Sequence, residues 1–394
     1  MNLAYWRLDY TFSLGWLVEG MPVKVRKVIG WIQRLGVAMV ISLFLSGAAL
    51  AAQTASIEAK IDAYLAEKVR AAGIPGLAVA VVQDGTVIFS RAYGVRKLGK
   101  GERLTPDHIF HFASVSKPLV ATAIVQLVEK GKLKLDDPVV KHLPYFRLAD
   151  ERYSEITIRQ MLNHTAGMPD VEDYEWDKPQ FDKGAAERYV RSLSTEKLLW
   201  APGSDWQYSN MAFDVLGDLI AKVSGLSFEE YMRINILEPI GMVNSSFMYP
   251  EIDKKLRTTG HIGDPARISA VYPYNRRHAP SSTLNSSVAE MARWMLVNLN
   301  WGELDGGRIL RDESYDLLWT STTDHEIGLG WFIYEEAGAW EVFHSGSDLG
   351  FRSYIMLSPD DGIGIVMASN WQLTDVDNEI VYDIMDLVLP LENE

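Results

Sequence analysis

Residues 114–117 place a hydroxyl and an amine at a spacing that supports nucleophilic catalysis. Ser114 and Lys117 open an apolar run, 118–130, which predicts a helix that ends at Gly131. Residues three apart share one helix face, with Cβ atoms about 5–6 Å apart. Lysine can activate a serine hydroxyl if burial or nearby positive charge lowers its pKa from about 10.4 to about 7–8. The pattern therefore indicates a serine nucleophile with a lysine base.

The spacing alone has an ordinary alternative, because S-x-x-K occurs by chance in a chain of this length. A second copy runs from Ser194 to Lys197. Each copy is compatible with a helix-capping serine followed by a solvated lysine. Only the sequence around each copy can distinguish a catalytic S-x-x-K from a chance one.

A second motif, Tyr208-Ser209-Asn210, is the only Y-x-N of the chain and precedes an apolar helix predicted over 211–224. A tyrosine on a loop can carry a proton between a nucleophile and a leaving group. The asparagine amide can hold a substrate carbonyl or order the lysine. The alternative is a core tyrosine followed by a helix-capping asparagine.

A third motif, His344-Ser345-Gly346, stands at the end of an apolar strand predicted over 340–344. Glycine at a strand edge allows a ligand backbone to approach closely. The alternative is a surface histidine at a strand end. Two further histidines, His108 and His111, precede the nucleophile and are interpreted as structural.

Strand patterns occur at the two ends of the chain and helical patterns between them. The predicted strands are 76–82, 86–93, 330–334, 340–344, 352–357 and 362–369, and the terminal helices begin near Ser56 and Ile380. This order predicts an α+β fold. One antiparallel sheet, built from both chain ends (about 57–100 and 325–394), is covered by the terminal helices, and a mostly helical region (about 105–320) is inserted. The polar stretch 169–190 is expected to be a surface excursion.

Composition and the N-terminus bound the partners and the compartment. The formal charge of −14 argues against nucleic acid and against docking on anionic lipid. The chain has no cysteine. Four basic residues between Lys24 and Arg34, an uncharged run over 35–50 and an A-x-A site at 49–51 have the form of a secretory signal. We therefore expect an N-terminal extension and signal over 1–51, an exported hydrolase domain over 52–394, and a periplasmic or extracellular location. An uncleaved anchor is the alternative.

The three motifs resemble, in type and order, those of the serine β-lactamase and penicillin-binding enzymes: S-x-x-K, then Y-x-N, then K-T-G or H-T-G. The likeness covers about residues 57–390 and is greatest to the class C β-lactamase-like group. That group includes D-alanyl-D-alanine carboxypeptidases, D-aminopeptidases and family VIII esterases. Four further segments carry the likeness: 74–82, 157–167, 291–295 and 328–331.

The resemblance implies a role for each residue of the motifs. Ser114 would be the acylated nucleophile, Lys117 its base, Tyr208 the proton carrier, and His344 would stand where β-lactamases have lysine. The substrate would be bound by Asn210, Ser345, Gly346 and Ser347, with the backbone N–H groups of Ser114 and Ser347 as oxyanion hole. The family uses no metal or other cofactor, and we expect none here.

These roles imply a serine acyl-hydrolase that acts on small esters or on peptides and amides of D-amino acids. A neutral histidine at position 344 makes strong β-lactamase activity less favourable, because it does not supply the permanent charge of lysine. The alternative function is a module that binds or senses penicillin or peptidoglycan peptides and turns over slowly or not at all.

Overall fold

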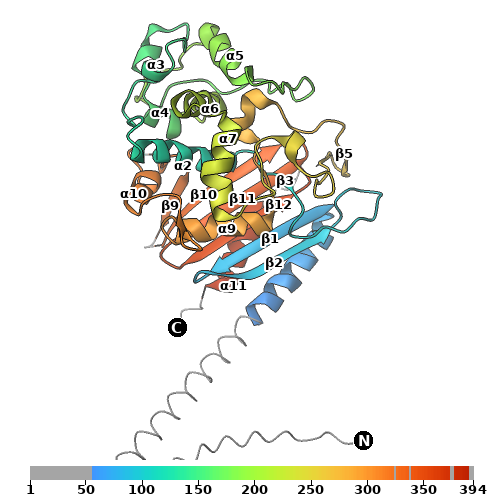
Figure 1. The fold of residues 1–394 in the computed structure, drawn as a ribbon. Coiled ribbons are helices and arrows are strands. Elements are labelled where there is room, and N and C mark those ends of the chain that lie inside the picture. The colour runs from blue at the N-terminus through green and yellow to red at the C-terminus, as the bar shows by residue number, and fades with distance from the viewer. Residues whose placement is uncertain (1–55, 324, 337–338, 373–376, 390–394) are drawn as a thin grey trace, which may run out of the picture. The chain divides into compact units, whose positions relative to one another are not determined.

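The computed structural model describes residues 56–323, 325–336, 339–372 and 377–389. The strands and helices of the fold belong to one compact unit that begins at Glu58. In the described ranges, six strands form one antiparallel sheet in the order β2-β1-β12-β11-β10-β9 (Figure 1). Their bounds are β1 Gly76–Gln83, β2 Thr86–Gly94, β9 Phe332–Glu336, β10 Ala339–Asp348, β11 Phe351–Ser358 and β12 Ile363–Ser369.

The sheet joins the two ends of the chain. Strand β1 pairs with β12 from Leu77 to Gln83, with Ala80 opposite Val366. The side chains of β1 are buried on both faces from Gly76 to Val82. A strand that is buried on both faces reads as a continuous apolar run, which is the pattern of this segment.

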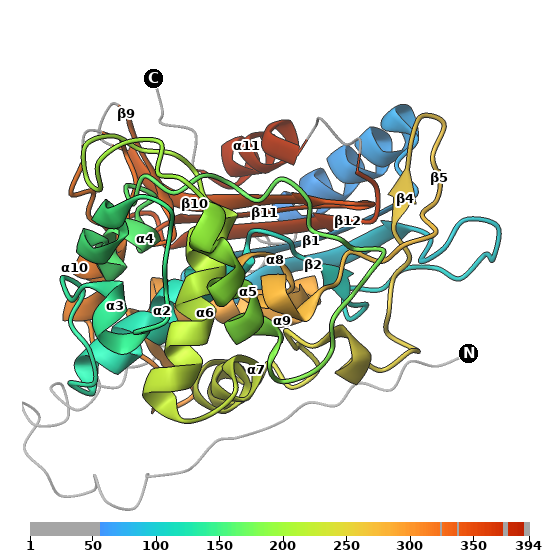
Figure 2. The same ribbon diagram turned by 90° about the horizontal axis from the view of Figure 1, so that it is seen from above.

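Helices cover both faces of the sheet (Figure 2). The helix over residues 58–72 and α11, Asp377–Val388, lie on one face, and Tyr64 of the first donates a 2.5 Å hydrogen bond to Asp383 of the second. Helix α9, Val288–Leu299, packs on the other face against β1 and β12. The predicted α+β architecture, with terminal helices over an antiparallel sheet, is confirmed.

The inserted region contributes the remaining helices and short strands. Helix α6 lies against α2 and α8, and the core between these helices and the sheet is apolar. The helices are α2 Ser116–Glu129, α3 Val139–His142, α4 Ile158–Leu162, α5 Ala185–Ser192, α6 Asn210–Ser224, α7 Phe228–Met232, α8 Ala279–Ser282 and α10 Glu313–Trp319. The short strands are β3 Phe110–His111, β4 His261–Ile262, β5 Arg267–Ile268, β6 Asn285–Ser286, β7 Glu303–Leu304 and β8 Gly307–Arg308.

Three local expectations differ from the structure. Helix α2 begins at Ser116, so Ser114 lies in the turn before it. Strand β10 continues to Asp348, so the third motif lies inside a strand rather than at its end. The stretch 169–190 is not wholly a surface excursion, because it ends in helix α5 with two of its side chains fully buried.

The predicted secretory signal falls outside the described residues. Within the described ranges, no helix is long and apolar enough to cross a bilayer.

Candidate active site

Ser114 lies in a tight turn between β3 and α2. The preceding residue, Ala113, has φ +47°, a left-handed conformation that costs a residue with a Cβ roughly 1–2 kcal/mol. The hydroxyl of Ser116 fastens the turn, because it donates to the Ala113 carbonyl at 2.6 Å and accepts the Leu284 N–H at 2.9 Å. The surrounding contacts therefore hold the serine in a strained but defined position.

Gly346 of β10 lies directly beneath this turn. A Cβ placed on Gly346 would be 2.4 Å from the carbonyl oxygen of Phe112 and 3.2 Å from the Cβ of Ala113. The Phe112 carbonyl also accepts a 2.7 Å hydrogen bond from Ser353 on the neighbouring strand. The space left by the missing side chain is thus filled by the protein's own atoms.

The Lys117 ammonium is fully buried and has three partners. Its Nζ donates to the Asn210 side-chain oxygen at 2.6 Å and to the Ser281 carbonyl at 2.8 Å, and lies 3.1 Å from the Ser114 hydroxyl. The first two partners can only accept. A neutral amine has two donors and one lone pair, so it keeps both bonds and presents the lone pair to Ser114.

Burial lowers the pKa of Lys117 to about 7, even though the carboxylates of Asp214, Asp170 and Asp348 act to raise it. Desolvation disfavours the charged form of an amine. A substantial fraction of the lysine is therefore neutral near pH 7, as a general base requires.

Asn210 has both ends of its amide occupied. While its oxygen accepts from Lys117, its nitrogen donates to the two oxygens of Asp170 at 3.0 and 3.2 Å. Asp170 also accepts the Asn210 backbone N–H at 2.8 Å. Of the two roles open from sequence, this geometry favours ordering the lysine over holding a substrate carbonyl.

Tyr208 lies beside both reacting groups. Lys117 Nζ is 4.8 Å from the centre of its ring. Burial holds the pKa of Tyr208 well above its usual value, although a hydrogen bond with Ser114 acts in the opposite direction. The phenol therefore stays protonated and is suited to donate a proton.

The Tyr208 ring stacks on the ring of His164. The two rings stack at 4.5 Å, and His164 Nδ1 accepts the Ser209 N–H at 3.1 Å. Burial places the pKa of His164 well below its ordinary value. His164 is thus a neutral support for the tyrosine and the following motif residue.

His344 is a neutral wall of the site. Burial and the nearby Lys117 lower the pKa of His344 to about 3. Its Nδ1 lies 2.7 Å from the Ser345 carbonyl, so this nitrogen carries the proton, and the buried Nε2 has no hydrogen-bond partner among the described residues. The ring centres of Tyr208 and Phe332 lie 6.2 and 5.2 Å away.

Strand pairing gives the direction of the Ser347 N–H. Strands β10 and β11 are joined by a two-residue loop, with Asp348 opposite Phe351 and Ser347 opposite Arg352. Hydrogen-bonded and non-hydrogen-bonded pairs alternate along antiparallel strands, and a two-residue hairpin closes on a hydrogen-bonded pair. The Ser347 N–H then points away from β11. Ser347 as a whole is exposed, and its N–H remains the predicted second donor of the oxyanion hole.

The structure therefore brings Ser114, Lys117 and Tyr208 into one site and lines it with His344. The second S-x-x-K is elsewhere: Ser194 and Lys197 are exposed, on and after a 3₁₀ turn that covers Leu193–Thr195. Among the residues that the structure describes, no cluster of three metal-ligating side chains occurs.

Several supporting residues were missed from sequence. Asp348 accepts hydrogen bonds from His111 and Ser282, both at 2.8 Å, at the far end of β10. Asp214 and Asp170 act on Lys117 from different elements. One signal was present, because Asp214 interrupts an apolar helix at the position one turn after Asn210, and a buried acid needs a partner.

The family model described as Beta-lactamase matches residues 61–389. The chain belongs to the Beta-lactamase family. The family and the serine–lysine geometry together support a serine hydrolase.

Two curated proteins are similar to this chain at moderate sequence identity. Protein flp of Staphylococcus aureus (strain COL) is 28% identical over 316 residues, which are 79% of this chain and 62% of the relative. Esterase EstB of Burkholderia gladioli is 30% identical over 239 residues, 55% of this chain and 58% of the relative. The chain thus spans about 60% of the length of these two curated relatives.

Solved structures agree with the fold. The octameric penicillin-binding protein homologue from Pyrococcus abyssi superposes with a TM-score of 0.69 at 28% identity, covering 79% of this chain and 73% of that one. A structure of SurE gives a TM-score of 0.72 at 23% identity, over 86% and 77% of the two chains. The second likeness concerns the fold alone.

Proposed function

We propose that the protein is an ester hydrolase that works through an acyl-enzyme on Ser114. The observation that carries the proposal is the buried Lys117 amine, which keeps two permanent acceptors, Asn210 and Ser281, and faces the serine hydroxyl at 3.1 Å. This arrangement supplies a nucleophile and a base that is neutral near pH 7.

Acylation begins when the Ser114 oxygen attacks the ester carbonyl and its proton passes to the Lys117 lone pair. The carbonyl oxygen becomes an oxyanion, and we expect the backbone N–H groups of Ser114 and Ser347 to stabilise it. When the intermediate collapses, the carbon–oxygen bond to the alcohol breaks and Tyr208 gives its proton to the leaving oxygen. Lys117 returns a proton to Tyr208, so the acyl-enzyme forms with the amine neutral again.

Deacylation repeats the steps with water in place of the alcohol. A water molecule attacks the acyl carbonyl and loses a proton to the same pair of groups, and Ser114 leaves as the protonated hydroxyl. The products are the carboxylic acid and the regenerated enzyme.

The charges near the serine favour neutral esters over substrates with a carboxylate. His344 is neutral, and Asp170, Asp214 and Asp348 lie close enough to Lys117 to affect its charge state. A substrate carboxylate would meet these anions, and the neutral His344 would not pair with it as a lysine would. We therefore rank small esters first, amides and peptides of D-amino acids second, and β-lactams last. The printed name of the relative Esterase EstB agrees with this order.

We also propose that the protein is exported to the periplasm or the exterior, because the segment over 21–51 has the form of a secretory signal. Its substrate there would be a small molecule. Fractionation of cells, followed by N-terminal sequencing, would show whether the chain begins near Ala52. Retention of the intact chain in the cytoplasm would contradict export.

The function is tested with a fluorophosphonate probe and a panel of p-nitrophenyl esters, D-alanyl-p-nitroanilide and nitrocefin. Wild type should be labelled and should turn over short esters fastest. Ser114→Ala should lose both properties, while Ser194→Ala, the same change in the exposed S-x-x-K, should keep them. Labelling by a fluorescent penicillin without release or ester turnover would support a sensing module instead. Full labelling of Ser114→Ala would refute the assignment of the nucleophile.

A further inference from the structure

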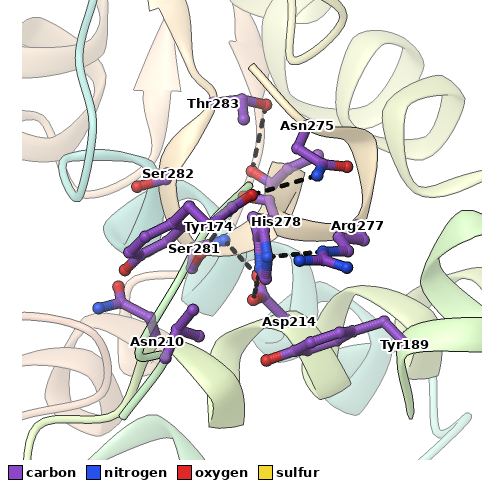
Figure 3. A network of polar contacts seen from close by, with 12 residues as sticks. Tyr174, Tyr189, Asn210, Asp214, Asn275, Arg277, His278, Ser281, Ser282 and Thr283 are labelled. Atoms are coloured by element: carbon purple, nitrogen blue, oxygen red, sulfur yellow. Dashed lines mark hydrogen bonds and ion pairs between the residues drawn. The ribbon is translucent and has the colours of Figure 1, made fainter. Parts of the chain in front are cut away.

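A buried carboxylate lies one helical turn beyond Asn210. Asp214 of α6 is fully buried, and its Oδ2 lies 2.6 Å from His278 Nδ1. Its Oδ1 accepts the backbone N–H of Ser281 at 3.2 Å. Figure 3 shows Asp214 facing the turn that carries His278 and Ser281. Both oxygens of this acid therefore bind the segment that also contacts the catalytic lysine.

The neighbours of His278 fix where its proton lies. Arg277 Nε, which is always protonated, donates to His278 Nε2 at 2.9 Å. His278 Nε2 must therefore accept, its Nδ1 carries the hydrogen, and Asp214 accepts it. This order of donors requires Asp214 to be the carboxylate and His278 to be neutral. Burial raises the pKa of Asp214, whereas the hydrogen bonds from His278 and Ser281 and the charge of Lys117 act in the opposite direction.

The chain of contacts extends to the surface. The guanidinium of Arg277 also pairs with Glu175 at 2.5 Å, so one arginine binds both the surface acid and the buried histidine. The ring of His278 is packed edge-on against Tyr174 and Tyr189, at 5.0 and 4.9 Å. The histidine is thus held by aromatic packing as well as by its two hydrogen bonds.

Ser281 links this network to Lys117. Its N–H donates to Asp214, and its carbonyl accepts from Lys117 Nζ at 2.8 Å. The two groups belong to one residue of the short helix α8, so Asp214 holds the backbone of the residue whose carbonyl contacts Lys117. Asp214 also has the largest effect among the carboxylates that oppose the effect of burial on the pKa of Lys117.

We propose that Asp214, oriented by His278 and Arg277, is a positioning residue that holds the Ser281 carbonyl against Lys117 and supplies a countercharge to this base. The proposal rests on the proposed function, because Lys117 must act as the base for it to matter. Asp214 does not contact the reacting atoms itself.

Other ionisable groups also face Lys117 and must be kept constant in a test. Asp170 and Asp348 act on it from the loop before α5 and from β10. His164 and His344 interact with it but are neutral because burial lowers the pKa of each. Tyr208 stays protonated because burial raises its pKa. The substitution of Asp214 leaves these five side chains in place.

The test is the pH dependence of kcat/KM for p-nitrophenyl acetate in Asp214→Asn. Loss of a nearby negative charge favours the neutral amine, so the pKa of Lys117 falls and the acid limb moves to lower pH. An opposite charge within about 4–6 Å is worth 1–3 pH units, and we expect a displacement of about one pH unit together with a lower maximal rate. A merely structural role would lower the rate without moving the limb.

The matched control is Asp218→Asn, one turn further along α6. Asp218 is also buried and accepts a 2.5 Å hydrogen bond from Tyr145, but it is not among the groups that affect Lys117. This variant should lose stability and keep the wild-type limb. Should Asp214→Asn fail to fold, the double variant Asp214→Asn/His278→Phe removes the unpaired donor and fills the aromatic pocket, and it should show the same displacement.

An acid limb that superimposes on wild type in a folded Asp214 variant, or that moves equally in Asp218→Asn, would overturn the positioning role. The failure of the proposed function has a different signature. In that case wild type itself would neither hydrolyse the ester nor react with fluorophosphonate at Ser114.

Discussion

Replacing Gly346 by alanine tests whether the nucleophile is held by direct packing on β10. The new Cβ would lie 2.4 Å from the Phe112 carbonyl oxygen and 2.4 Å from Ser353 Oγ. Relief to a 3.0 Å contact requires a shift of at least about 0.6 Å. The Phe112 carbonyl belongs to the backbone immediately before Ala113 and Ser114, so the turn itself must move.

The expected effect follows from the size of that shift. A misplacement of 1 Å can lower a rate about 100-fold, so we expect acylation by Gly346→Ala to be roughly 10- to 100-fold slower. Overpacking costs about 1–3 kcal/mol of stability. The assay is single-turnover labelling by a fluorophosphonate under conditions where the variant is fully folded, with thermal unfolding measured in parallel.

Gly364→Ala is the matched control in the neighbouring part of the same sheet. There the added Cβ would meet the side-chain ends of Val82, Leu357 and Met295 at 2.8, 3.0 and 3.1 Å. Side-chain ends can move aside more easily than backbone, and none of these three residues is adjacent in sequence to Ser114. This variant should lose stability but acylate at the wild-type rate. Wild-type acylation by Gly346→Ala would refute the packing argument.

Three further predictions follow from the charge states. In wild type, kcat/KM should rise about tenfold per pH unit up to about pH 7 and then level off, since only neutral Lys117 accepts the serine proton; a profile that is flat from pH 5 to 8 would contradict this. The free energy of unfolding, measured in urea, should fall as the pH drops from about 6.5 towards 3, because the pKa of His344 is lower in the folded than in the unfolded chain. This group contributes a loss of at most about 1.4 kcal/mol per pH unit, and His344→Phe should make the loss smaller. His344→Lys should lower KM for nitrocefin about tenfold, because the new lysine can form an ion pair with the nitrocefin carboxylate that is worth about 1.4 kcal/mol. The KM for a neutral ester should not fall in the same way.

Much of the fold was readable because its signals are local. The strands predicted over 76–82 and 86–93 are β1 and β2 of the structure, and the first is a continuous apolar run whose side chains are buried. Boundaries were less accurate where tertiary contacts extend an element. Strand β10 continues through the third motif to Asp348 because β11 pairs with it up to the hairpin.

The site was readable only as far as its short motifs. Ser114, Lys117 and Tyr208 carry a signature of type and order, and the structure places them together. The contacts that define the roles of Asn210 and Gly346 are made with Asp170 and Phe112. Such pairings between distant segments depend on tertiary packing and leave no periodic trace in the sequence.

The identity of residue 344 couples substrate choice to the strength of the base. His344 and Lys117 already interact, and the lysine lowers the pKa of the histidine. A lysine at position 344 would add a permanent cation beside the buried amine, and like charges disfavour each other. It would attract a substrate carboxylate and, by the same field, lower the pKa of Lys117 further. The acid limb of His344→Lys should therefore move below that of wild type whenever its affinity for carboxylate substrates rises. A variant that gains nitrocefin affinity with an unmoved limb would show that the two effects arise from separate causes.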